Sequence, residues 1–147
     1  MKHLYIFLLA SLIYSTGSNA QTVTDFTKKD CNTGASHNLF SELNSGKAII
    51  MEFFHTCISC SNAAKDIKPM YQNLVLKYGN KVLFYVMPED DSYTCSDVLN
   101  WVNTNGLSSV VIPLDSGSVQ TAYYGGMAMP SIAVVAGSAH QLSLIHI

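Results

Sequence analysis

Near-continuous apolar runs alternate with segments of helical periodicity along most of the chain. Four such runs cover residues 47–54, 81–86, 110–114 and 131–135. Runs of this kind are typical of strands that are buried on both faces, as in the middle of a parallel sheet. Strands that alternate with helices indicate an α/β fold, which here predicts a central mixed sheet flanked by helices.

The clearest helix lies between the first two runs. Its apolar residues recur at steps of four and three, which places them on one face of a helix. These residues are Cys60, Ala64, Ile67, Tyr71, Leu74 and Tyr78. Gly79 predicts the end of the helix, and Pro69 predicts a kink because proline has no N–H to donate. Shorter helices are predicted over 36–44, from a Ser96 cap to Gly106, and over 118–124.

The first 20 residues have the three-part pattern of a secretory signal peptide. Lys2 and His3 precede an apolar run over 4–14, and Ser18-Asn19-Ala20 supplies the small residues of a cleavage site. Cleavage there predicts an exported protein, periplasmic or extracellular, that begins at Gln21. The run is shorter than the roughly 20 apolar residues of a membrane span, so we expect no stable span after cleavage. A short membrane anchor is the alternative.

The last six residues, 142–147, match the translation of a common sequencing adaptor. We interpret them as an artefact, so that the natural domain covers residues 21–141 and continues beyond them. A genuine apolar tail is the alternative.

The net charge of the predicted mature chain argues against some classes of binding partner. Without Lys2 the chain has seven lysines, ten acidic residues and no arginine, which gives a net charge of 7 − 10 = −3. Phosphate binding requires clustered basic charge. We therefore expect neither nucleic acid nor an anionic membrane as a partner.

Cys57-Ile58-Ser59-Cys60 follows a buried strand directly and begins the clearest helix. The N-terminus of a helix carries about half a positive charge and free N–H donors, and both favour a thiolate over a thiol. The pattern predicts that Cys57 is the exposed, attacking thiol and that Cys60 is the buried, resolving one. The chemistry that results is thiol–disulfide exchange through a mixed disulfide.

A metal site is the alternative for the same pair, because two cysteines at this spacing also form half of a zinc site. Cys31, Cys95 and His55 are available as further ligands, but no second cysteine or histidine pair has zinc spacing. Several methionines suggest Cu(I) binding, although scattered methionines more often fill a core. These are Met51, Met70, Met87, Met127 and Met129. We expect no resident metal and no cofactor.

The chain has four cysteines, and an even number in an exported chain suggests two disulfides, which four cysteines allow in three connectivities. If the close pair Cys57 and Cys60 forms one bridge, Cys31 and Cys95 are left for a second, structural one. Two free thiols at Cys31 and Cys95 are the alternative.

Three features together resemble the thioredoxin superfamily: the strand over 49–54, the cysteine pair at the start of a helix, and Met129-Pro130 before the last run. The order of elements around 113–115 and 123–126 is similar to the exported TlpA-like branch. The resemblance covers residues 46–135. It implies a thioredoxin-like α/β domain whose last strand and helix are missing from this sequence. It also implies that Pro130 is cis beside the cysteines and that the backbone at Met129 pairs with an extended substrate segment.

The chain departs from the pattern of this superfamily at three places. Thr56 stands where tryptophan usually precedes the first cysteine, and Ala63 where TlpA-like members often have an acid. Glu52 corresponds to the thioredoxin acid beneath the active site, but its connection to Cys57 is one residue shorter. A buried Glu52 with a raised pKa would carry a proton to or from Cys60. The alternative is that the strand turns Glu52 to solvent or a polar pocket.

His55 precedes Cys57 by two residues and is a candidate for the substrate-binding side of the site. When protonated it would lower the pKa of the Cys57 thiol. A surface histidine without a role is the alternative.

The sequence thus predicts an exported thiol–disulfide oxidoreductase whose partners are protein thiols or disulfides and a redox partner that the sequence does not identify. A metal carrier and a non-catalytic binding module with a permanent disulfide are the alternatives. The direction of electron flow is not predicted, because Ile58-Ser59 matches neither the usual reductant nor the usual oxidant pair between the cysteines.

Overall fold

The apolar runs form the strands of one five-stranded mixed sheet. The computed structural model describes residues 23–124 and 128–146, so the predicted signal peptide lies outside the described residues. The strand order is β5-β4-β3-β6-β7. Strand β3 (Ala48–Phe54) is central and runs parallel to β4 (Val82–Pro88), which is parallel to β5 (Ile112–Pro113). Strands β6 (Ser131–Ala136) and β7 (Gln141–His146) complete the sheet with antiparallel pairing.

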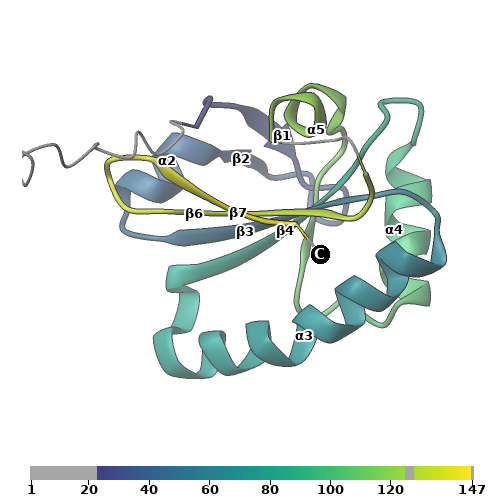
Figure 1. Cartoon of the computed structure of the whole chain (residues 1–147), viewed down its shortest axis with the longest axis horizontal. Helices are drawn as coiled ribbons and strands as arrows, with labels where there is room; N and C mark the ends of the chain where they lie inside the picture. Colours follow the sequence, from purple (N-terminus) through teal and green to yellow (C-terminus); the bar gives the residue numbers. More distant parts are fainter. Residues whose placement is uncertain (1–22, 125–127, 147) are drawn as a thin grey trace, which may run out of the picture.

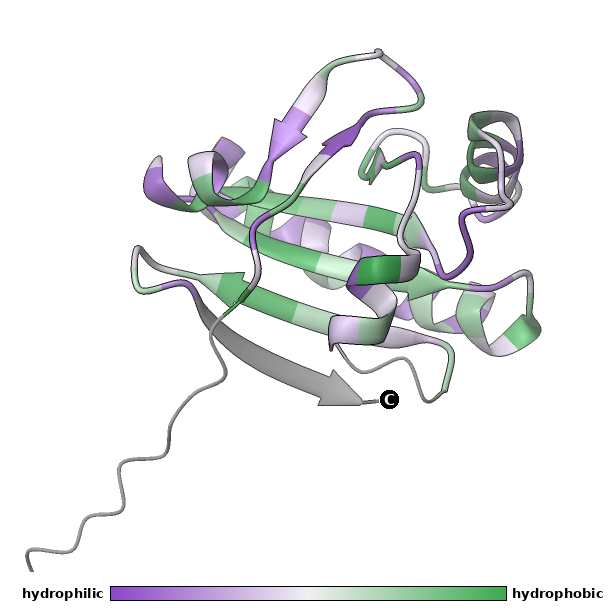
Figure 2. Ribbon diagram, turned by 90° about the horizontal axis from the view of Figure 1, so that it is seen from above, coloured by the Kyte–Doolittle hydropathy of each residue, from purple (hydrophilic) through white to green (hydrophobic). Residues whose placement is uncertain are grey.

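Helices cover both faces of the sheet (Figure 1). Helix α3 (Ile58–Tyr78) lies on one face and continues through Pro69. Helices α2 (Leu39–Asn44) and α5 (Ser118–Tyr124) lie on the other face, together with a hairpin of β1 (Thr27–Lys29) and β2 (Ser36–Asn38). Figure 2 shows that the central strands are mostly apolar and that the hairpin is mostly polar.

Two hydrophobic clusters result from this layering, one on each face of the sheet. Ile50 and Phe54 of β3 belong to the cluster under α3, whereas Ile49, Met51 and Phe53 belong to the cluster under α2 and α5. Successive side chains of a strand point to opposite faces. Because both faces are covered, every position of β3 from Ile49 onward is buried, which explains its continuous apolar run.

Helix α4 (Cys95–Thr104) packs in the same cluster as α3. Its Trp101 ring stacks on Phe54, with ring centroids 4.1 Å apart. The prediction that Ser96 caps this helix is wrong. The cap is Thr94, whose side chain accepts a hydrogen bond from the backbone N–H of Asp97, while the Asp97 carboxylate accepts one from the Thr94 backbone. This reciprocal pair satisfies two N–H donors that the first turn leaves open.

Two other predicted elements are shorter than expected. The helix predicted over 36–44 begins at Leu39, because residues 36–38 form β2 and the Asn38 side chain caps α2 by accepting from the Ser41 backbone N–H. The run 110–114 forms a strand only at Ile112–Pro113, at the edge of the sheet. An edge position suits proline, which has no N–H to donate to a further strand.

A strand that we expected to be missing is present. Strand β7 pairs with β6 from Gln141 opposite Ala136 to His146 opposite Ser131. It therefore lies largely within residues 142–147, the segment that we interpret as an adaptor. Pairing at a sheet edge uses backbone N–H and C=O groups, which any segment without proline provides. The origin of the segment and the missing final helix stay predictions.

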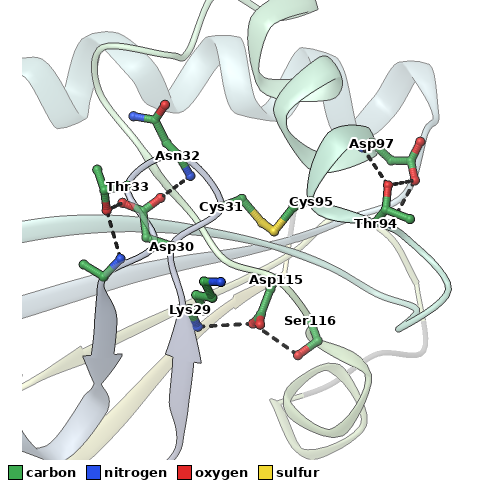
Figure 3. The surroundings of a disulfide bond; sticks show 11 residues. Lys29, Asp30, Cys31, Asn32, Thr33, Thr94, Cys95, Asp97, Asp115 and Ser116 are labelled. Carbon is green, nitrogen blue, oxygen red and sulfur yellow. Dashed lines mark hydrogen bonds between the residues drawn. A yellow bond between two sulfur atoms is a disulfide. The ribbon is translucent and has the colours of Figure 1, made fainter.

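A disulfide between Cys31 and Cys95 joins the hairpin to the first residue of α4 (Figure 3). Asp30, next to Cys31, accepts hydrogen bonds from the Asn32 backbone and the Thr33 hydroxyl. The backbone of Cys31 also donates to the Pro113 carbonyl, at 2.8 Å. The bridge thus ties the hairpin across the end of the sheet to the helix that packs beside α3.

Among the described helices none is long and apolar enough to span a membrane.

Removing this bridge is expected to destabilise the fold without destroying the cysteine pair of α3. The two cysteines are 64 positions apart, and closing a loop of that length stabilises a protein by about 4 kcal/mol in the chain-entropy model. We expect the double variant Cys31→Ser/Cys95→Ser to lose stability of that order in a denaturant titration. An unchanged midpoint and slope would contradict a structural role for the bridge.

Candidate active site

The two remaining cysteines lie where β3 passes into α3. After Phe54, residues His55 and Thr56 connect the strand to Cys57, which has extended backbone dihedrals and is the N-cap of α3. Both thiols are free; Cys57 is half-buried, and Cys60, one turn into the helix, is fully buried. The pair therefore presents one sulfur to the surface and keeps the other beneath it.

The sulfur of Cys57 acts as the capping group of the helix. It accepts a hydrogen bond from the backbone N–H of Cys60 at 3.3 Å and lies 3.1 Å from the Ser59 hydroxyl. Partial burial by itself raises the pKa of the Cys57 thiol, but the hydrogen bonds from the Cys60 and Ser59 side chains and backbones lower it below its usual value. The helix N-terminus thus stabilises the thiolate, which is the reactive form.

Cys60 has the opposite environment. Burial, together with its hydrogen bond to Cys57 and the negative charges of Cys57 and Glu52, raises the pKa of its thiol to about 12. The backbone N–H of His55 donates to its sulfur at 3.4 Å and partly offsets this rise. Cys57 is therefore the more acidic thiol of the pair, and Cys60 is protonated at neutral pH.

Glu52 lies in β3 on the same face as Ile50 and Phe54, under α3, and is fully buried. Val86 and Ile132 are its neighbours across the two adjacent strands. Neither carboxyl oxygen has a hydrogen-bond partner among the described residues. Burial, and secondarily the charge of Cys57, raises the pKa of Glu52 to about 8. The side chain does not face solvent, so it is a neutral acid at pH 7 and interacts electrostatically with both cysteines.

His55 lies at the surface of the site and has two partners that we did not predict from the sequence. Its Nδ1 is 2.6 Å from Oε1 of Glu89 and 3.2 Å from the hydroxyl of Tyr93. The same hydroxyl lies 3.3 Å from the Thr56 hydroxyl. Glu89 and Tyr93 follow β4, whose carboxyl end is next to that of β3 in the parallel pair. That adjacency was a signal that could have identified both residues.

Met129 and Pro130 lie next to the same end of β3. Ser131 is opposite Phe53 in the antiparallel pair, so the two residues before it lie beside the segment that carries Cys57. The Met129–Pro130 peptide bond is cis. Met129 is half-buried and packs against both hydrophobic clusters. The structure thus brings together six of the predicted residues: Glu52, His55, Cys57, Cys60, Met129 and Pro130.

Cys31 and Cys95 are bonded to each other, so they are not ligands for the pair in α3. Within the described residues, no group of three or more histidine, cysteine, aspartate or glutamate side chains is arranged to hold a metal ion.

The different environments of the two thiols predict selective alkylation. In the protein with Cys57 and Cys60 reduced, iodoacetamide at pH 7 should modify Cys57 more than about a hundredfold faster than Cys60, because only thiolates react and Cys60 is both protonated and buried. Mass spectrometry of peptides from timed, acid-quenched samples measures both rates, with the bonded Cys31 and Cys95 as internal controls. Similar rates for the two thiols would contradict the described geometry.

The buried Glu52 predicts an unusual dependence of stability on pH. Its pKa is near 8 in the folded protein and about 4.3 in an unfolded chain. Between these values the folded state binds one more proton, so the free energy of unfolding falls as pH rises, by up to about 1.4 kcal/mol per pH unit. The neutral variant Glu52→Gln should lack this decline.

Denaturant titrations of both proteins from pH 5 to 7, with Cys57 and Cys60 oxidised so that neither thiol titrates, measure the difference. The gap between the variant and the wild type should widen toward pH 7 in favour of the variant. A constant gap would mean that Glu52 ionises normally.

Known structures resemble the fold of this chain, whereas no family model and no curated protein matches its sequence. A protein from Bacteroides thetaiotaomicron, provisionally assigned as a protein disulfide isomerase, aligns with 86% of this chain and 77% of its own, at a TM-score of 0.70 and 18% identity. A thio-disulfide isomerase from Thermus thermophilus aligns with 86% and 84%, at a TM-score of 0.60 and 20% identity.

The exposed lipoprotein thioredoxin of Streptococcus pneumoniae aligns with 84% of this chain and 88% of its own, at a TM-score of 0.59 and 22% identity. At these identities the likeness concerns the fold, and it agrees with the mixed sheet and the flanking helices. The predicted architecture is confirmed: the chain has the thioredoxin fold.

Proposed function

We propose that this protein is an exported thiol–disulfide oxidoreductase that exchanges disulfides with protein substrates through Cys57 and Cys60. The observation that carries the proposal is the unequal environment of the two thiols at the start of α3. One sulfur is accessible and has a lowered pKa, whereas the other, one turn away, is buried and has a raised pKa. A pair with a permanent structural role would not need this asymmetry.

The reaction follows from that asymmetry. The Cys57 thiolate attacks one sulfur of a substrate disulfide, which forms a mixed disulfide and releases the other substrate sulfur as a thiolate that takes a proton from water. Cys60 then loses its proton and attacks Cys57. The mixed disulfide breaks, the second substrate thiolate leaves, and the protein retains a Cys57–Cys60 disulfide. The same steps in reverse oxidise a substrate dithiol.

Glu52 is the base that we propose for the second step. Once Cys57 is in a mixed disulfide, its negative charge is gone, and with it one of the two causes that raise the pKa of Glu52. The carboxyl group then ionises more easily at the moment when Cys60 must lose a proton. Two observations support this role. Glu52 is buried, and neither of its carboxyl oxygens has a hydrogen-bond partner among the described residues, so both oxygens are available to accept a proton.

We propose that the substrate lies beside the cis peptide bond before β6, where the backbone of Met129 would pair with an extended segment. Support comes from the position of Met129 and Pro130 next to the carboxyl end of β3. His55 lies on the exposed side of the pair and would contact the substrate together with its partners Glu89 and Tyr93.

Export is supported by the pattern of residues 1–20 and by the name of the Streptococcus pneumoniae protein, an exposed lipoprotein thioredoxin. Outside the cytoplasm thiols oxidise, so a reducing protein there requires an electron donor. A protein that donates disulfides requires a partner that reoxidises it. A redox partner is therefore required in either direction.

A redox titration against glutathione tests the function and gives its direction. The oxidised fraction of Cys57 and Cys60 is measured by thiol trapping at defined ratios of reduced to oxidised glutathione. A midpoint at or below about −230 mV would identify a reductant, and one near −120 mV a disulfide donor, by comparison with known thioredoxin-fold proteins. The variant Cys60→Ser is the control for signals that do not come from the pair. If the pair does not titrate, the proposed function is wrong.

A further inference from the structure

A groove of about 520 Å³ lies beside Cys57, between the first turns of α3 and helix α4. Cys57 is part of its wall, Trp101 forms part of its apolar surface, and Asn62, Lys65, Asn100 and Thr104 contribute polar groups. Neither Met129 nor Pro130 is among the residues that line it. The groove is therefore separate from the segment before β6, and the nucleophile Cys57 is one of the residues that line it.

Four polar side chains of this groove have no partners within the described chain. Asn62, Lys65, Asn100 and Thr104 form no hydrogen bond or ion pair with any described residue. Other polar groups differ in this respect: the Asp97 carboxylate, which also lines the groove, accepts hydrogen bonds from Thr94, and the Lys68 ammonium, which lies outside it, donates to the carbonyl of Gly106. The groove thus presents exposed donors and acceptors that are not used within the described chain, next to a reactive sulfur.

The dimensions and chemistry of the groove indicate its occupant. From Asp97 to Thr104 the helix α4 rises about 10 Å, at about 1.5 Å per residue. An extended chain rises about 3.3 Å per residue, so the groove accommodates about three extended residues. Each asparagine offers one carbonyl acceptor and two N–H donors, which match the N–H and C=O groups of a peptide backbone.

We infer that this groove binds the extended polypeptide segment next to the substrate cysteine, through its backbone, while that cysteine is bonded to Cys57. The inference rests on the proposed function and specifies its substrate: a cysteine in an unfolded or extended segment, with little dependence on neighbouring side chains. Asn62 and Asn100 bind the backbone, and Lys65 binds a carbonyl or carboxylate oxygen. Small disulfides that lack peptide groups react at Cys57 without using the groove.

The reaction is the exchange already described, with the groove as the binding site for one product. The Cys57 thiolate forms a bond to one sulfur of a peptide disulfide, and the second peptide leaves as a thiolate and takes a proton from water. The first peptide stays in the groove until Cys60 attacks Cys57 and releases it as a thiolate. Two peptide thiols and one protein disulfide result, so electrons and protons balance.

A comparison of two disulfide substrates tests the inference. One is the disulfide-linked dimer of a short blocked peptide with a central cysteine flanked by alanines, and the other is bis(2-hydroxyethyl) disulfide. The rate constant for oxidation of the reduced protein is measured with each. We expect Asn62→Ala/Asn100→Ala to slow the peptide reaction about tenfold, the loss that two ordinary hydrogen bonds produce, and to leave the hydroxyethyl reaction unchanged. The control Asn73→Ala, an exposed asparagine of α3 outside the groove, should change neither.

The outcomes separate the inference from the function on which it rests. If wild-type protein reacts with both disulfides and the double variant keeps its rate with the peptide, the groove is not the binding site. An equal loss with both disulfides also overturns the inference, because the asparagines would then act on Cys57 itself. If wild-type protein reacts with neither disulfide, the proposed function fails and the inference fails with it.

The single tryptophan of the chain, Trp101, supplies an independent measurement because it lines the groove. In the variant Cys60→Ser, Cys57 is converted to a stable mixed disulfide either with the peptide or with 2-mercaptoethanol. We expect the peptide adduct alone to shift the Trp101 emission, and the Asn62→Ala/Asn100→Ala changes to reduce that shift. Identical emission from the two adducts would place the peptide elsewhere.

Discussion

The hydrogen bond from the Cys60 backbone N–H to the Cys57 sulfur is the interaction on which the rest of the site depends. It requires that a helix begin at Cys57, and that in turn requires a rigid strand, β3, ending three residues earlier. Burial of β3 between β4 and β6, with helices on both faces, supplies that rigidity. The central sheet therefore determines where the reactive sulfur lies and which charge it carries.

Local patterns predicted the elements around that interaction well. The apolar run before Cys57 is β3, the stripe from Cys60 to Tyr78 is one face of α3, and residues 118–124 form α5 as predicted. These signals are strong because burial on both faces and helical periodicity leave direct traces in a sequence. Capping was less predictable: both Thr94 and Ser96 can cap a helix, and only the carboxylate of Asp97, three residues after Thr94, distinguishes them.

The bridge between Cys31 and Cys95 was predicted, but other features that depend on tertiary contacts were not. The polar segments 27–29 and 36–38 form a hairpin only because they lie across the sheet, and the sequence has no apolar alternation there. Glu89 and Tyr93 belong to the site because parallel strands bring their carboxyl ends together; the predicted parallel pairing indicates this region, but residue spacing does not show which side chains contact His55. The groove beside Cys57 likewise requires the relative position of α3 and α4.

The bridge between Cys31 and Cys95 imposes an order on the biogenesis of the protein. A ribosome makes Cys31, Cys57 and Cys60 before Cys95, which lies 64 positions after Cys31. Until Cys95 emerges, Cys31 has only the two functional cysteines as intramolecular partners. Correct maturation therefore requires either that oxidation wait for the complete chain or that an early mispairing be exchanged later. In the second case the protein needs, for its own synthesis, the same thiol–disulfide exchange that it is proposed to perform on other proteins.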